Sequence, residues 1–129
     1  MESPIITLKS SLSVDDAVAA LQSATVAAGF GIQANHDVNA TMAKKGVTFE
    51  HPVRIVEMCE PNYAKTMLGL DLNISAAMPC RISVYAKDGQ TYLATIAPQA
   101  MLAMFDAADG ADVANAVQDI LVGIMNKAC

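Results

Sequence analysis

The amino-acid sequence predicts one α+β domain over residues 1–129, with a mostly antiparallel sheet that carries helices on one face. Three observations support this fold class. Apolar residues recur at helical spacing between Val14 and Ala28, two alternating runs flank an Asp88-Gly89 pair, and an apolar stripe marks a closing helix from Ala111. A chain of 129 residues suits one hydrophobic core, and neither a linker nor an internal repeat divides it.

The N-terminal part predicts a strand followed by a helix. A β-branched run from Pro4 to Leu8 favours a strand. Ser13 is a suitable N-cap, and Asp15 and Asp16 fall in the first turn, where the helix dipole favours negative charge. Gly29 then ends a helix of about 15 residues.

The middle of the chain predicts two further strands and a helix. Phe30 to Val38 favours a strand, and Asn39 to Gly46 favours a single helical turn. Val53 to Met58 is a second strand, entered through a proline that removes little hydrogen bonding there. Pro61 suits the first position of a helix that runs to about Leu70, and a loop or short turn leads on to Pro79.

A hairpin and a short helix precede the closing helix. Cys80 to Ala86 and Thr91 to Ile96 alternate with period two around Asp88-Gly89, which is a strong hairpin signal. Pro98 begins an apolar helical segment through Phe105, and Asp106 to Asp109 marks a loop.

Composition limits the classes of partner. Apolar residues make up 53% of the chain and charged residues 16%, so we expect part of the apolar surface to meet a partner. A net charge of −5 and the absence of Trp argue against a nucleic-acid interface. No apolar run reaches the ~20 residues that span a bilayer. The start of the chain resembles no signal peptide and the three cysteines suit a reducing compartment, so we expect a cytoplasmic protein, although a periplasmic protein after leader removal gives the same pattern.

Four segments carry a family resemblance. They are residues 35–46, residues 56–64, residues 78–85 with the sequence MPCRISVY, and the Asp88-Gly89 hairpin that leads to Pro98. Together they resemble the bacterial and archaeal domain-of-unknown-function-302 family. The resemblance implies a curved antiparallel sheet with helices on one face, like a half-repeat of the TATA-binding protein, and it suggests a homodimer. It brings no catalytic residue.

Two cysteines and two methionines are the candidate metal ligands. If the strand ending at Met58 pairs antiparallel with the strand beginning at Cys80, then Cys59 and Cys80 lie at the same end of the sheet. Thiols and the thioethers of Met58 and Met78 are soft ligands, which suit Cu(I) or haem iron. The alternative is that all four are core residues, since free Cys and Met commonly fill apolar interiors.

A haem site draws on a partly different set of residues. The candidates are His36, Met78 and Cys80, with the two subunits of a dimer each supplying one axial ligand. The Cys59 to Cys80 spacing matches no closed zinc pattern, which argues against structural zinc.

Three functional hypotheses remain open at this point. The first is a non-enzymatic binding module, a homodimer that holds haem or a soft metal ion near its interface. The second is a structural or interaction dimer without a ligand. The third is a thiol redox protein that uses Cys80, which requires a lowered thiol pKa. Hydrolase and phosphate-loop signatures are missing from the sequence, so nothing in it argues for an enzyme.

Overall fold

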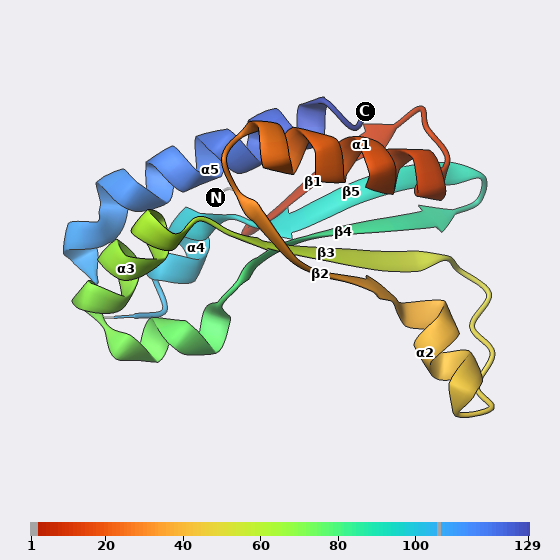
Figure 1. Ribbon diagram of the computed structural model, residues 1–129, viewed down its shortest axis with the longest axis horizontal. Helices are drawn as coiled ribbons and strands as arrows, with labels where there is room; N and C mark the ends of the chain where they lie inside the picture. The colour runs from red at the N-terminus through yellow and green to blue at the C-terminus, as the bar shows by residue number, and fades with distance from the viewer. Residues whose placement is uncertain (1–2, 106) are drawn as a thin grey trace.

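The computed structural model describes residues 3–105 and 107–129. Five strands and their connecting helices follow one another along the chain (Figure 1). The elements are β1 (Ile5–Ser10), α1 (Val14–Ala27), β2 (Gly31–Asp37), α2 (Val38–Lys44), β3 (Val53–Cys59), α3 (Pro61–Leu70), the 3₁₀ helix η1 (Leu72–Ala77), β4 (Cys80–Lys87), β5 (Gln90–Ile96), α4 (Pro98–Leu102), the 3₁₀ helix η2 (Ala108–Gly110) and α5 (Ala111–Asn126).

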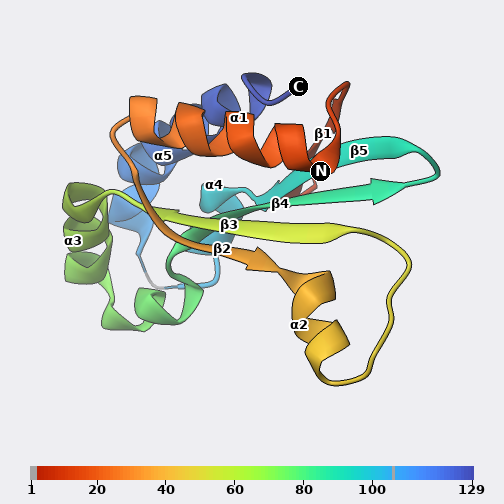
Figure 2. The ribbon, with the colours of Figure 1, turned by 45° about the vertical axis from the view of Figure 1, so that its right-hand side comes forward.

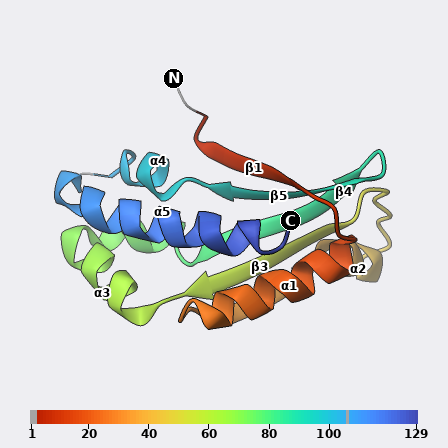
Figure 3. The same ribbon diagram turned by 90° about the horizontal axis from the view of Figure 1, so that it is seen from above.

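The strands form one open sheet in the order β1-β5-β4-β3-β2, and every neighbouring pair is antiparallel. Helices α1 and α5 lie side by side across one face of this sheet (Figures 1 and 3). The core forms between these two layers, where Leu21 of α1 and Leu121 of α5 meet Val56, Ile82 and Leu93 of the central strands. The predicted α+β class with helices on one side is therefore confirmed.

Local chemistry explains where the main elements begin and turn. Ser13 caps α1 by accepting a hydrogen bond from the backbone N–H of Asp16, as its sequence position predicts. Asp88 and Gly89 both adopt positive φ, 52° and 78°, in the two-residue turn between β4 and β5. Asp tolerates this region better than most residues and Gly adopts it freely, so the predicted hairpin is confirmed.

Several boundaries differ from the sequence prediction. The expected loop before Pro79 contains η1, because Asp71 caps it at the backbone N–H of Asn73 and Ile74 is buried. Helix α4 ends at Leu102 instead of Phe105. The predicted loop from Asp106 to Asp109 overlaps η2, and residue 106 lies outside the described residues.

Helix α2 and the loop after it project from the β2 and β3 ends, away from the α1 and α5 layer (Figure 2). The helix is longer than the single turn expected and buries none of its side chains. Asn39 holds the loop in place. Its side-chain amide donates to the carbonyl oxygens of Phe49 and His51 at 3.1 and 2.9 Å, and its oxygen accepts from the N–H of Val53 at 2.7 Å.

At the opposite end of the sheet, β3 leads into α3, and η1 leads into β4. Met58 is the register partner of Cys80, so the strand pairing inferred from sequence is confirmed. Gly110 joins η2 to α5 where a Cβ atom would lie 2.7 Å from Cδ1 of Leu70. A larger residue at position 110 would therefore require the Leu70 side chain to move. Within the described chain, no helix has both the length and the apolar content to cross a membrane.

Candidate functional site

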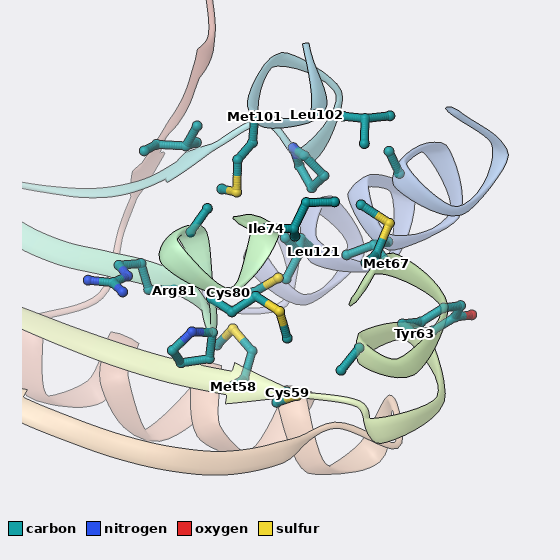
Figure 4. Close-up of a pocket in the computed structure, with 18 of the residues that line it drawn as sticks. Met58, Cys59, Tyr63, Met67, Ile74, Cys80, Arg81, Met101, Leu102 and Leu121 are labelled. Carbon is teal, nitrogen blue, oxygen red and sulfur yellow. The ribbon is translucent and has the colours of Figure 1, made fainter. Parts of the chain in front are cut away.

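A cavity of about 330 Å³ occupies the end of the sheet where Met58 and Cys80 lie (Figure 4). Its floor comes from the ends of β3, β4 and β5, and its walls come from α3, η1, α4 and α5. The side chains of Ile74, Leu102 and Leu121 contribute apolar wall from three of these helices. A cavity of this size falls at the lower end of the range for small-molecule sites.

Sulfur is the most unusual feature of the lining. Five methionines and two cysteines contact the cavity: Met58, Cys59, Met67, Met78, Cys80, Met101 and Met104. Figure 4 shows that Met58, Met67, Cys80 and Met101 reach the same space from β3, α3, β4 and α4. Thioethers are flexible and polarisable, so a wall of this kind adapts to ligands of different shape.

The cavity brings together three of the predicted site residues and Met58. Met58, Met78 and Cys80 all line it, and so does Cys59. Met58 and Cys80 are register partners and therefore share one face of the sheet. Cys59 follows Met58 at the end of β3 and also lines the cavity, close enough to the Cys80 thiol to affect its pKa.

The Cys80 thiol is largely withdrawn from water. Burial raises its pKa, the nearby Cys59 adds to this effect, and Arg81 opposes it. Desolvation penalises the charged thiolate, which makes the neutral thiol the stable form at neutral pH. The raised pKa of Cys80 is the opposite of the lowered thiol pKa that a redox nucleophile requires.

His36 lies outside the cavity. It is the register partner of Ile55 in β2, and its Nε2 contacts the carboxylate of Glu57 across the sheet. His36 does not line the cavity, and its side chain is 49% exposed. The structure therefore does not bring His36 together with Met78 and Cys80.

Two charged side chains contact the cavity, within the described lining. Glu60 is committed to helix α3, because its carboxylate accepts hydrogen bonds from the backbone N–H of Tyr63 and from the amide of Asn62, both at 2.9 Å. The hydrogen bond from Tyr63 is the main cause of the lowered Glu60 pKa. Arg81 is exposed, and no ion pair involves it among the residues that the structure places.

Neither Thr95 nor Tyr63 offers a free hydroxyl to the methionine side of the cavity. The hydroxyl of Thr95 donates to the carbonyl oxygen of Arg81 at 2.7 Å. Tyr63 packs its ring near Phe30, with ring centroids 6.1 Å apart, and Figure 4 shows its hydroxyl directed away from the methionines. The interior therefore offers a ligand mainly apolar contact.

A second, larger cleft of about 520 Å³ lies near the α2 end of the sheet. Arg54 donates from its two terminal nitrogens to Asp15 and to Asn35, both at 3.2 Å, while its buried Nε has no hydrogen-bond partner, and Asp37 caps α2. In residues 3–105 and 107–129, no group of three or more His, Cys, Asp or Glu side chains is arranged to hold a metal ion. The sulfur-rich cavity is therefore the better candidate site.

Sequence reasoning missed the helical half of the cavity. Met67 and Met101 lie on α3 and α4, far in sequence from the two cysteines, and only the tertiary structure brings them near Cys80. The high methionine content, eight residues in 129, was the one signal that pointed toward a sulfur-rich site.

Comparison with known proteins supplies the family. Residues 6–128 match the model of the domain of unknown function DUF302. A crystal structure of an uncharacterised conserved DUF302 protein from Bacillus stearothermophilus superposes with a TM-score of 0.93 at 22% identity, covering 99% of this chain and 100% of that one. No curated protein matches the sequence. The match over nearly the whole chain confirms the resemblance inferred from sequence: this protein belongs to the DUF302 family.

Proposed function

We propose that this protein is a non-enzymatic binding module that holds a small, largely apolar molecule in the sulfur-rich cavity. One observation carries the proposal: side chains from seven separate elements line about 330 Å³ of mostly apolar space that opens to the surface. A concave, mostly apolar pocket of this size is typical of small-molecule sites. An engineered apolar cavity of about 150 Å³ already binds benzene.

A neutral fluorescent probe tests the proposal directly. We expect N-phenyl-1-naphthylamine to bind the full chain with enhanced fluorescence. Ala77→Phe places a ring on η1 at the cavity wall and should weaken binding at least tenfold, whereas Ala43→Phe on exposed α2 should not. Ala64→Phe on α3 provides a second blocking variant if the first fails to fold. A probe that binds all variants equally, or none, contradicts the proposal.

The alternative ligand is a soft metal ion or haem held by sulfur. The shared face of Met58 and Cys80, with Met78 also lining the cavity, favours thioether and thiol ligation. Cys59 also lines the cavity, as the predicted thiol pair requires, whereas the position of His36 outside the cavity weighs against the ligand set predicted for haem. Elemental analysis and an absorption spectrum of freshly purified protein separate this alternative from an apolar organic ligand.

Homodimerisation through the sheet is the second part of the proposal. Helices α1 and α5 cover one face of the sheet, and on the other side α2 projects from the β2 and β3 ends (Figure 2). Tyr85 and Tyr92 alternate with the buried Val84 and Leu93, so they lie on this second face, where their rings stack with centroids 5.2 Å apart. Ile5 and Ile96 pair across β1 and β5, and each is 44% exposed. Such a surface favours self-association.

Light scattering at micromolar concentration tests the dimer. We expect twice the chain mass for the unmodified protein and the monomer mass for Ile5→Asp. Leu72→Asp changes an exposed apolar residue away from the sheet and should leave the dimer mass unchanged. A monomer mass for the unmodified protein contradicts this part.

A further inference from the structure

The chemistry at the cavity edge identifies the class of ligand more closely. The inference rests on the proposed binding function and adds a specific polar contact. Of the two charged side chains in the described lining, Glu60 caps α3 with its carboxylate and carries a negative charge, so it does not attract an anionic ligand. Arg81 therefore supplies the positive charge of the lining, and its exposed guanidinium points away from the sulfur side chains, outside the mouth of the cavity (Figure 4).

Arg81 is also kept free of its nearest acidic neighbour in the strand ladder. Glu57 is the register partner of Arg81 across β3 and β4, the position where an opposite-charge pair normally forms. The Glu57 carboxylate instead contacts Nε2 of His36 on β2. No carboxylate lies within ion-pair distance of the Arg81 guanidinium in the described part of the chain.

An exposed apolar side chain extends the wall out of the cavity. Met104 contacts the cavity, yet it is 70% exposed and does not belong to the Ile5 and Ile96 pair assigned to the dimer. A ligand seated inside can therefore keep apolar contact as it leaves the cavity and reaches the surface. An amphipathic molecule matches this arrangement, because its apolar body can occupy the cavity and its apolar edge while its polar group reaches the Arg81 cation.

We propose that the cavity binds an amphipathic carboxylate, with an apolar body inside and its carboxylate paired with Arg81. The volume is about twice that of a benzene-sized cavity, which gives a body on the order of ten carbon atoms. One guanidinium presents a planar pair of donors that matches the two oxygens of a carboxylate. Since no second cation contacts the described lining, a doubly charged phosphate is less well matched.

Competition against N-phenyl-1-naphthylamine tests the assignment on the full chain. Decanoate should displace the probe, and its neutral methyl ester should do so at least tenfold less effectively. In Arg81→Gln the ratio of the two affinities should fall at least tenfold. Lys87→Gln removes an exposed cation farther along β4 and should preserve the ratio.

The outcomes separate the ligand class from the binding function itself. Equal competition by decanoate and its ester, or an unchanged ratio in Arg81→Gln, overturns the carboxylate assignment while the cavity still binds the probe. Stronger competition by decyl phosphate than by decanoate also overturns it. Failure of the probe and of both decanoyl compounds to bind overturns the inference and the proposed function together.

Discussion

Met58 of β3 lies opposite Cys80 of β4, and this pair joins the hydrophobic core to the candidate cavity. Met58 is fully buried and packs with the core beneath α1 and α5. Cys80 is partly buried and packs against the same cluster. Changes at this pair should therefore report on both stability and ligand binding.

Replacing Met58 should destabilise the fold more than replacing an exposed methionine. Met58→Ala removes a fully buried side chain, so we expect the free energy of unfolding to fall by about 2–5 kcal/mol. Met104→Ala, at a position 70% exposed, should change it by less than about 0.5 kcal/mol. Urea denaturation measures both; similar losses in the two variants contradict the packing described for Met58.

Of the three cysteines, Cys80 should react most slowly with a thiol reagent and Cys129 most rapidly. Burial raises the Cys80 pKa and limits access, so iodoacetamide should label it at pH 8 more slowly than it labels the denatured protein. Cys129 is exposed and should react first. Peptide mass spectrometry gives the two rates. Faster labelling of Cys80 in the native state would favour the thiol redox hypothesis instead.

Alkaline pH should weaken the fold through Cys80. Because its folded-state pKa is raised, the native protein holds the proton more tightly than the unfolded chain does. The resulting stabilisation is present below the unfolded thiol pKa, about 8.5, and is lost as the pH rises above it. Chemical denaturation between pH 7 and 10 should show that the free energy of unfolding falls more steeply with pH for the unmodified protein than for Cys80→Ala. Parallel curves would show that Cys80 does not contribute.

Acidic pH should reveal the cap on α3. The backbone hydrogen bond from Tyr63 lowers the Glu60 pKa, so the stabilisation is present above the unfolded carboxyl pKa and is lost as the pH falls through the folded value. Glu60→Ala should be less stable than the unmodified protein at pH 7, and the difference should shrink on acidification. Glu50→Ala, at a side chain 86% exposed, serves as the control. If the stability difference between Glu60→Ala and the unmodified protein does not change with pH, the charge of Glu60 does not contribute to the cap.

Asn39 should control the order of the projecting loop. Asn39→Ala removes three hydrogen bonds to the backbone of residues 49, 51 and 53, with an expected stability loss of about 1–3 kcal/mol. Hydrogen exchange in residues 46–52 should accelerate, while exchange in α1 should change little. Asn73→Ala, at an exposed position on η1, should leave the loop protected. Unchanged exchange in Asn39→Ala would contradict its role.

The sequence by itself determined the local elements and much of their order. Ser13, Pro61 and the Asp88-Gly89 turn act through their immediate neighbours, so their consequences are readable from adjacent residues. The pairing of the Met58 and Cys80 strands also followed from sequence, since an antiparallel sheet places the end of one strand beside the start of the next.

Only the tertiary structure decided the composition of the site. Met67 and Met101 join Cys80 because α3 and α4 pack at one end of the sheet, and Arg81 stays free because His36, from a third strand, contacts Glu57. These relationships depend on contacts between residues far apart in the chain. Sequence periodicity assigns a residue to a face of its own element, but packing between elements decides which faces meet.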